Sequence, residues 1–188
     1  MSNAFVFGYG SLVNRRTHDM AEAYPARITG WRRAWAHTGL REVAFLTAVP
    51  DPGAEIEGLV AAIPGGDWAA LDAREWAYDR HALGDGVSHG AGRALQVSVY
   101  AVAAAKAAPP SVRHPILLSY LDAVVQGYLR EFGKDGAARF FDTTGGWEAP
   151  ILNDRPAPRY PRAQALGAPE RDFVDEQITR AGGRVVAG

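Results

Sequence analysis

The sequence predicts a mixed α+β fold in which a small β-barrel or curled sheet is packed by helices. Strand-like segments joined by turns fill most of the first half of the chain, whereas most helical segments follow later. The chain has 188 residues, 47% of them hydrophobic, which suits a single domain with one ordinary core. We therefore expect one domain over residues 1–188, with residues 143–188 as a C-terminal extension or lid.

The first expected strand covers residues 4–7, a short apolar run that ends at the loop Gly8-Tyr9-Gly10-Ser11-Leu12. Two glycines around a tyrosine allow positive φ and expose backbone N–H groups, which can hold a small anion or the oxygen of a carbonyl under attack. The loop lacks the glycine pattern of a dinucleotide-binding fingerprint or a nucleophile elbow, and the lysine of a P-loop. Glycines that serve only the geometry of a turn are the alternative interpretation.

Three further strands are expected before the first helix, over residues 26–36, 42–49 and 55–63. The prolines and glycine at residues 50–53 predict a tight turn between the second and third of them. In the first of these strands, Arg32 and Arg33 point in opposite directions, so at most one can face a pocket. We interpret both as residues of a solvated sheet face.

The first helix is predicted over residues 67–83, because Asp67 can cap it and no Gly or Pro follows before Gly84. Its apolar positions share one face with Glu75: Trp68, Leu71, Tyr78 and Ala82. A carboxylate on a buried face loses hydration, so Glu75 either pairs with a cation or works as an acid or base. Asp79, one helical turn later, is a like charge that would raise the pKa of Glu75. The alternative is a surface carboxylate that contacts a residue one turn away.

The second half of the chain is predicted to be mainly helical. After a glycine-rich loop and a strand over 93–102, helices are expected over 115–132, 137–141 and 169–180, with Gly133 closing the first. Residues 147–160 carry several prolines and an aromatic residue at each end. Such a rigid, extended segment often covers a pocket or an interface. We interpret it as a specificity lid or a dimer contact, in which Asn153 or Arg155 meets part of a ligand.

Composition and charge argue against several classes of protein. The formal net charge of −1 gives no general attraction to nucleic acid or to an anionic membrane. The absence of cysteine excludes disulfides and thiolate chemistry, and the 5 histidines show no metal-ligand spacing. We therefore expect no metal and no cofactor. No signal peptide or transmembrane stretch is evident in the sequence, so a cytoplasmic location is the default expectation.

Two motifs taken together resemble the γ-glutamylcyclotransferase superfamily, and within it the ChaC-like or AIG2-like branch. The first is Val-Phe-Gly-Tyr-Gly-Ser-Leu at residues 6–12, and the second is Leu-Asp-Ala-Arg-Glu at residues 71–75. Gly-Trp-Arg-Arg-Ala-Trp at 30–35 and Gly-Leu-Val at 58–60 also match, with a weaker match in Ser-Tyr-Leu at 119–121 and Gly127. The resemblance implies a γ-glutamylcyclotransferase-like fold.

The resemblance also implies a set of site residues. In that family the loop backbone cradles the γ-glutamyl group of the substrate, and a single glutamate is the general acid/base. These roles would fall on Tyr9, Gly10, Ser11 and Leu12 for the loop and on Glu75 for the acid/base. Tyr78 stands loosely for a tyrosine that follows the Arg-Glu pair in ChaC-like proteins. Tyr120 either places its hydroxyl in the site or packs in the core.

The reaction that the resemblance implies is a cyclisation. The α-amino group of a γ-glutamyl amide attacks the γ-carbonyl, which gives 5-oxoproline and releases an amine. One carboxylate of raised pKa can move both protons. The candidate small-molecule substrates are glutathione, a γ-glutamyl amino acid and a γ-glutamyl amine, and the chemistry needs no metal, cofactor or covalent nucleophile.

Two other functions stay open, and a homodimer is the assembly to be tested. A non-catalytic protein of the same fold would use the pocket to sense or carry a small acidic metabolite, and it would have no need of a buried base at Glu75. A serine hydrolase built on Ser11 would need a histidine and an acid from elsewhere in the chain. It would also react with a fluorophosphonate probe.

Overall fold

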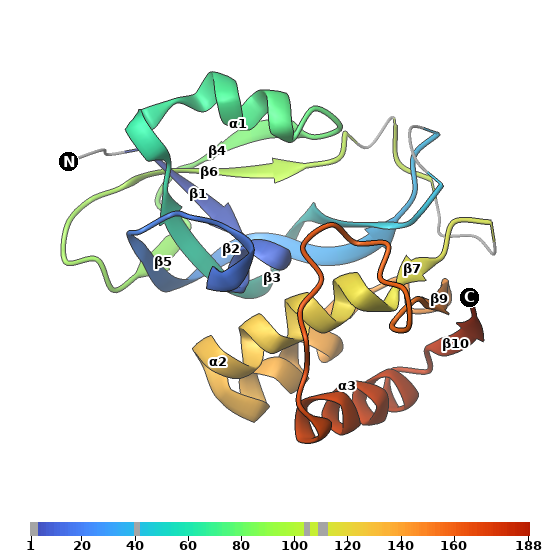
Figure 1. Cartoon of the computed structure of the whole chain (residues 1–188). Coiled ribbons are helices and arrows are strands. Elements are labelled where there is room, and N and C mark those ends of the chain that lie inside the picture. The colour runs from blue at the N-terminus through green and yellow to red at the C-terminus, as the bar shows by residue number, and fades with distance from the viewer. Residues whose placement is uncertain (1–3, 40–41, 104–105, 109–112) are drawn as a thin grey trace.

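The computed structural model describes residues 4–39, 42–103, 106–108 and 113–188, and its strands form two sheets (Figure 1). The larger sheet has 7 strands in the order β4-β6-β1-β3-β2-β5, with β8 paired to β2, and the smaller has 3 strands in the order β10-β9-β7. The larger sheet contains β1 (Ala4–Gly8), β2 (Ala23–Ala36), β3 (Phe45–Ala62), β4 (Asp79–Leu83), β5 (Val87–His89), β6 (Gln96–Ala101) and β8 (Thr144–Gly145). The smaller contains β7 (Ile116–Leu117), β9 (Pro150–Asn153) and β10 (Arg184–Ala187).

Helices pack on both sides of the larger sheet, and this α+β arrangement with a curled sheet confirms the predicted fold class (Figure 1). α1 (Trp68–Arg74) covers one side, while α2 (Leu118–Asp142) and α3 (Ala168–Arg180) lie on the other. Three short 3-10 turns complete the structure: η1 (Ser11–Val13), η2 (Arg15–Thr17) and η3 (Pro64–Gly66). Among the described residues, no helix has the length and apolar character needed to cross a membrane.

The central strand β1 supplies side chains to two hydrophobic clusters, because successive residues of a strand point to opposite faces. Phe5 and Phe7 enter the main core together with residues of α2, whereas Val6 enters a smaller cluster with Leu71 of α1. β1 pairs antiparallel with β3 and parallel with β6, so both of its edges are also covered. The loop that follows β1 therefore starts from a strand that is fixed on every side.

The predicted turn at residues 50–53 is wrong, because β3 runs through it as one strand. Thr29 of β2 pairs with Glu55 of β3, and Trp31 pairs with Pro50, so residues 51–54 stand opposite Gly30 alone. Gly30 adopts φ 81°, in the left-handed region that glycine tolerates. The turn-forming residues thus make a large bulge between two long paired strands, and the pairing on either side keeps the chain extended.

The predicted helix over residues 67–83 is also wrong in its second half. α1 ends at Arg74, and residues 79–83 form β4, which pairs antiparallel with β6. No Gly or Pro marks this end in the sequence, so helix propensity favoured continuation. In the structure, residues 79–83 instead make backbone hydrogen bonds with β6 at the edge of the sheet. This pairing depends on residues distant in the sequence, so local helix propensity does not predict it.

The second half of the chain agrees better with the sequence. The expected helices over 115–132 and 137–141 appear as one element, α2, with a break at Gly133 (φ 68°, ψ −173°), and α3 matches the helix expected over 169–180. α2 begins at Leu118 rather than at Pro115, because residues 116–117 pair with β9. Within the C-terminal segment, β8 pairs parallel with β2 of the larger sheet.

Gly127 is the point at which α2 contacts the turn that follows the first loop. A Cβ placed on Gly127 would lie 2.5 Å from the backbone N of Asn14 and 2.8 Å from the carbonyl carbon of Val13. Since these are backbone atoms, a side chain at residue 127 would push the turn off the helix. Only glycine allows the helix and the turn to approach this closely.

We expect Gly127→Ala to lower the free energy of unfolding by about 1–3 kcal/mol through overpacking. The sign is informative, because Gly→Ala inside a helix normally stabilises a protein by up to about 1 kcal/mol. Urea unfolding of both proteins measures the difference. Gly84→Ala is the control, since a Cβ on Gly84 meets nothing within 4 Å. A Gly127→Ala variant as stable as the parent would contradict the contact.

Candidate active site

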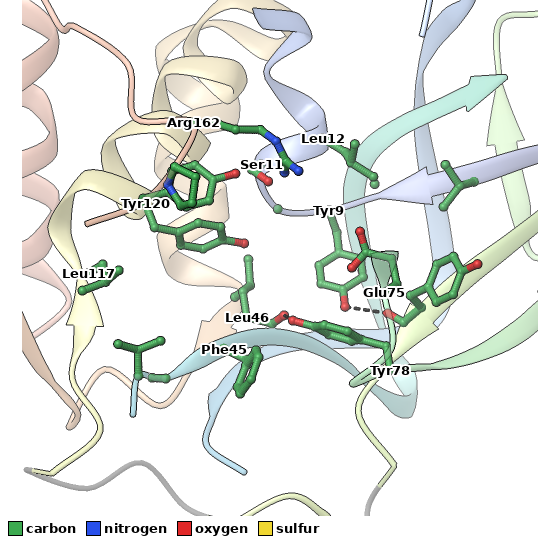
Figure 2. A pocket seen from close by; sticks show the side chains of 18 of the residues that line it. Tyr9, Ser11, Leu12, Phe45, Leu46, Glu75, Tyr78, Leu117, Tyr120 and Arg162 are labelled. Carbon is green, nitrogen blue, oxygen red and sulfur yellow. Dashed lines mark hydrogen bonds between the residues drawn. The ribbon is translucent and has the colours of Figure 1, made fainter. Parts of the chain in front are cut away.

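One cavity of about 620 Å³ is lined by all the residues to which the family resemblance assigned a site role (Figure 2). It lies between the loop after β1, the end of α1, the start of β3, the start of α2 and a segment that follows β9. The predicted residues that line it are Tyr9, Gly10, Ser11, Leu12, Glu75, Tyr78 and Tyr120. The cavity therefore unites side chains from both halves of the chain.

The loop after β1 leads into the 3-10 helix η1. The first backbone N–H groups of a helix have no acceptor within the helix itself. Val13 N donates to Gly10 O (3.0 Å) and Asn14 N donates to Ser11 O (2.9 Å), which leaves the amides of Ser11 and Leu12 outside this hydrogen-bond pattern. Both residues line the cavity. The Ser11 N–H donates to the Tyr120 hydroxyl, so a substrate oxygen would share or replace this bond, and the Leu12 N–H adds a second donor for a carboxylate or for a carbonyl oxygen that gains negative charge.

The two glycines of the loop serve close approach rather than positive φ, which corrects the expected reason for them. Neither is among the positive-φ glycines of the described chain. A Cβ on Gly10 would lie 2.6 Å from the Tyr120 hydroxyl, and a Cβ on Gly8 would lie 2.4 Å from Cβ of Leu12. Gly10 is thus the residue that lets the Tyr120 hydroxyl approach the loop backbone.

Residues of α2 fix the loop after β1 through buried hydrogen bonds. The Asn14 side chain donates from Nδ2 to the carbonyl of Ala123 (2.9 Å) and to Oε1 of Gln126 (3.1 Å). The Tyr128 hydroxyl lies 3.0 Å from the carbonyl oxygen of Tyr9. These groups are buried, so each hydrogen bond replaces one that water would otherwise make. The geometry of the loop is therefore set by the core and not by the loop alone.

Glu75 lies at the C-terminal cap of α1 and not on a helical stripe. Its backbone (φ −94°, ψ 30°) leaves the helix while its N–H still donates to Leu71 O (2.9 Å). Its carbonyl accepts from Tyr78 N (2.8 Å) in the turn that leads to β4. The side chain is half-buried, and its carboxylate points into the cavity beside the Tyr9 ring (Figure 2). The pattern singled out Glu75 through a helix that ends before it, and the structure places Glu75 at the cavity.

The neighbours of Glu75 differ from those that a longer helix would provide. Asp79 is not one helical turn away, because it begins β4 and lies near Lys106, 3.9 Å from carboxylate to ammonium. Asp67 does cap α1 as expected, with Oδ1 accepting from Ala70 N (3.1 Å). The expected influence of Asp79 on Glu75 through the helix therefore has no structural basis.

Three tyrosines that line the cavity are influenced by the charge of the Glu75 carboxylate. Burial raises the pKa of Tyr9, Tyr100 and Tyr120 above the ordinary phenol value, and the negative charge of Glu75 adds to each shift. All three hydroxyls consequently stay protonated at neutral pH. Tyr9 donates to the carbonyl of Tyr100 (2.6 Å).

Tyr100 is a cavity residue that the sequence analysis missed. It lies in β6, and its hydroxyl donates to the carboxylate of Asp72, one turn before Glu75 in α1. The hydrogen bond ties the end of α1 to the sheet and so helps to place Glu75. No local pattern signals this contact, because a tyrosine in a strand and an acid on a helix are both common.

A segment after β9 forms the far wall of the cavity with Arg159, Tyr160, Pro161 and Arg162. The Tyr160 ring packs edge-on against Tyr120 with 5.0 Å between centroids, and the Arg162 side chain extends toward Ser11 (Figure 2). The expected ligand contacts of Asn153 and Arg155 are not seen in this cavity. Arg155 instead pairs with Asp122 and Asp175, each at 2.8 Å, and the Asn153 side chain accepts from the backbone of Arg155 (3.3 Å).

Asp154 fastens this segment to the start of α2. Its carboxylate accepts from Ser119 N (2.8 Å), from the Ser119 hydroxyl and from Arg159 N (2.9 Å). Two of these donors lie in the first turn of α2, where amides have no partner inside the helix. One buried carboxylate thus caps the helix and holds the wall of the cavity.

We expect Asp154→Asn to lower the free energy of unfolding by about 1–3 kcal/mol, because an amide offers one acceptor oxygen to three donors. Its NH₂ group would face an N–H or O–H donor wherever the carboxylate now accepts. Urea denaturation measures the loss. Asp172→Asn, an exposed change on α3, is the control. Equal stability of the two variants would show that Asp154 does not anchor the segment.

Arg33 is fully buried, so its interpretation as a solvated residue was wrong. Its guanidinium donates to the carbonyl of Glu57 (2.8 Å), the hydroxyl of Tyr128 (2.8 Å) and the hydroxyls of Thr143 and Thr144. Burial lowers its pKa through loss of hydration. The Tyr128 hydroxyl also lies 3.0 Å from the carbonyl oxygen of Tyr9, so this hydrogen-bond network extends to the loop after β1.

The histidines form no group with a metal-binding arrangement in the part of the chain that the structure describes. No group of three His, Cys, Asp or Glu side chains comes together there. His37 and His114 stack in parallel with 3.7 Å between ring centroids, away from the cavity. None of the described residues that line the cavity is a histidine.

Comparisons with solved structures find the same fold in other proteins. Among solved structures, a γ-glutamyl cyclotransferase shares 16% identity and a TM-score of 0.57, over 92% of this chain and 98% of that chain. An uncharacterized protein from Homo sapiens shares 16% identity and a TM-score of 0.58, over 91% of this chain and 97% of the other. YkqA from Bacillus subtilis shares 17% identity and a TM-score of 0.54, over 76% of this chain and 56% of its own. At these identities the likeness shows the fold.

The sequence itself decides the family. No curated protein matches the chain. A family model described as "Gamma-glutamyl cyclotransferase, AIG2-like" matches residues 6–132, which include the loop after β1, Glu75 and the first turns of α2. The chain therefore belongs to the AIG2-like γ-glutamyl cyclotransferase family.

Proposed function

We propose that this protein converts a γ-glutamyl amide into 5-oxoproline and a free amine, with Glu75 as the general acid/base. The observation that carries the proposal is the shared cavity, which is lined by Glu75, Ser11 and Leu12 and into which the Glu75 carboxylate points (Figure 2). Its volume, about 620 Å³, is in the range of pockets that bind small molecules. Family membership supports this chemistry.

The reaction needs several proton transfers and one exchange of C–N bonds. Glu75 takes a proton from the α-ammonium group, and the neutral nitrogen attacks the γ-carbonyl carbon to form the new C–N bond. The carbonyl oxygen becomes an oxyanion, which the amides of Ser11 and Leu12 stabilise. As the oxyanion collapses, Glu75 gives this proton to the leaving nitrogen and the bond to the leaving amine breaks. The new ring nitrogen still carries a second proton to be lost, which Glu75 takes as the lactam forms and passes to the released amine, so the amine leaves as an ammonium ion.

Much of the catalysis comes from holding the substrate in its ring-closing conformation. The nucleophile is part of the substrate, so the protein must only bring the α-nitrogen close to the γ-carbon and keep it there. Tyr9, Tyr120 and the η1 turn form rigid walls, because each is fixed by core contacts. The hydroxyls of Tyr9 and Tyr100 already donate within the protein, so Tyr120 is the tyrosine of this group whose protonated hydroxyl can donate to the substrate.

A serine hydrolase built on Ser11 gains no support from the cavity. A nucleophilic serine needs a base to take its proton, and the described residues that line the cavity include no histidine. We expect no labelling of Ser11 by a fluorophosphonate probe. A non-catalytic binder of the same fold remains the second candidate, and turnover separates it from the enzyme.

The proposal is tested by measuring 5-oxoproline release from glutathione, γ-glutamyl-alanine and the γ-glutamyl amide of 1,4-diaminobutane. We expect product from at least one compound in the absence of added metal or cofactor. Binding of a γ-glutamyl compound without any product would instead establish a binding protein. Neither binding nor product from the whole panel would overturn both candidate functions.

A further inference from the structure

We propose that Arg159 and Arg162 form an anion-binding subsite that selects γ-glutamyl substrates whose leaving half carries a carboxylate. The inference rests on the proposed function, because it assigns the far end of the same cavity. Both arginines line that cavity, and the Arg162 side chain reaches toward Ser11 from the side opposite Glu75 (Figure 2). The cavity thus has the Glu75 carboxylate on one side and the Arg162 guanidinium on the other, and Arg159 also lines it.

The two guanidinium groups are available to a ligand. Within the described chain, neither guanidinium makes a hydrogen bond or an ion pair with another residue, and the bonds of the two arginines are made by backbone atoms, Arg159 N to Asp154 and Arg162 O from Gln164 Nε2 (3.1 Å). Arg155, in the same segment, shows the contrast because both sides of its guanidinium are occupied by Asp122 and Asp175. Two cations that converge on one cavity repel each other unless an anion lies between them. The planar guanidinium fork matches the two oxygens of a carboxylate.

The segment that carries these arginines is held in place before any ligand binds. Asp154 accepts from Arg159 N, Tyr160 N donates to the Ser119 hydroxyl (3.3 Å), and Ala163 N donates to Tyr160 O (3.0 Å). The Tyr160 ring also packs against Tyr120. Because the backbone is fixed on both sides of the arginines, binding costs little ordering of the main chain. A fixed segment can therefore discriminate between charges.

The reaction geometry assigns the arginines to the leaving half of the substrate. The α-amino group must reach Glu75, and the γ-carbonyl oxygen must reach the amides of Ser11 and Leu12. The substrate's own carboxylate is attached to the carbon that bears the α-amino group, so it stays on the Glu75 side. The leaving amine departs from the γ-carbon in the other direction, toward Arg162. A carboxylate there gains two charge-assisted hydrogen-bond donors, whereas an ammonium group is repelled.

Apart from Glu75, Glu42 is the one acidic residue among the described residues that line the cavity. It is exposed, and it precedes β3. If a cationic leaving half were preferred, Glu42 would be its partner. The experiment therefore includes a change at this residue as well as at the arginines.

The test compares three leaving halves of different charge. γ-Glutamyl-alanine carries a carboxylate, γ-glutamyl-alaninamide is neutral, and the γ-glutamyl amide of 1,4-diaminobutane is a cation. The kcat/KM for 5-oxoproline release is measured for the parent, Arg159→Gln, Arg162→Gln, Arg162→Glu and Glu42→Gln. Arg171→Gln, a change of an exposed arginine on α3, is the matched control. The dissociation constants are measured in parallel on Glu75→Gln, alone and combined with Arg162→Gln.

We expect the parent to prefer γ-glutamyl-alanine over the alaninamide by about ten-fold or more, equivalent to about 1.4 kcal/mol. Arg162→Gln should remove most of that preference and change the alaninamide reaction less than about two-fold, and Arg162→Glu should favour the cation. Equal losses on all compounds would overturn the proposal, since the arginines would then hold the γ-glutamyl half. A preference of the parent for the cation, lost in Glu42→Gln, would also overturn it.

Failure of this inference is distinguishable from failure of the proposed function. If no compound is turned over but Glu75→Gln binds γ-glutamyl-alanine more tightly than the alaninamide, the subsite stands and the catalytic proposal falls. If turnover occurs without charge preference, the catalytic proposal stands and the subsite falls. Glutathione, added as a fourth compound, reports whether the carboxylate can lie one residue farther from the scissile bond. Absence of any binding would overturn both.

Discussion

Glu75→Gln is expected to lower kcat for 5-oxoproline release by about 10²–10⁴-fold while substrate binding is largely kept. The range is that of general acid–base catalysis by one positioned side chain. Glutamine has nearly the shape of glutamate but cannot take a proton from the α-ammonium group or return it to the leaving amine. Steady-state kinetics on the best substrate of the panel measures the loss, and calorimetry on the variant measures binding.

Two further variants make the result specific. Glu75→Asp keeps the carboxylate but withdraws it by one methylene, so we expect an intermediate loss, because proton transfer depends on distance. Glu148→Gln alters an exposed glutamate outside the cavity and should leave kcat unchanged. A Glu75→Gln variant with full activity would refute the role of Glu75. A loss of binding equal to the loss of turnover would assign Glu75 to substrate recognition instead.

The position of Glu75 shows how a sequence pattern can single out a residue that lines the cavity although the predicted element is wrong. The periodic pattern predicted a helix through Tyr78, whereas α1 ends at Arg74 and the chain turns to join the sheet. Both arrangements bring Glu75 and Tyr78 close together, because residues three apart are neighbours on a helix and also in a turn closed by the hydrogen bond from Tyr78 N to Glu75 O (2.8 Å). The predicted proximity of Glu75 and Tyr78 therefore holds although the predicted secondary structure is wrong.

Other features could not have been predicted locally. The arginines at the far end of the cavity reach it because Asp154 binds the start of α2, far away in the sequence. Arg33 alternates with Arg32 in a strand, and nothing in that pattern says which of the two faces the core. The structure decides this through Tyr128 and Glu57, which belong to other elements. Partners that are distant in the sequence therefore decide which charged side chain is buried.

Arg33→Met is expected to cause the largest loss of stability among the changes considered, about 3–5 kcal/mol. The guanidinium is 1% exposed, and its donors reach a carbonyl and three hydroxyl groups. Methionine fills much of the volume but donates nothing, so the cluster loses all four hydrogen bonds. The guanidinium also lies over the rings of Tyr128 and Phe140, at 5.3 and 5.0 Å from their centroids, and these cation–π contacts are lost as well.

The adjacent arginine provides a matched control for this prediction. Arg32 points the other way, is partly exposed and makes one long ion pair with Asp51 (3.7 Å), so Arg32→Met should change the free energy of unfolding by less than about 1 kcal/mol. Urea unfolding of both variants gives the comparison. Equal stabilities would mean that the cost of burying the guanidinium cancels its hydrogen bonds. Arg33→Lys separates charge from shape, because an ammonium group cannot reach four acceptors in one plane. If lysine restores stability, the charge alone matters and the planar fork does not.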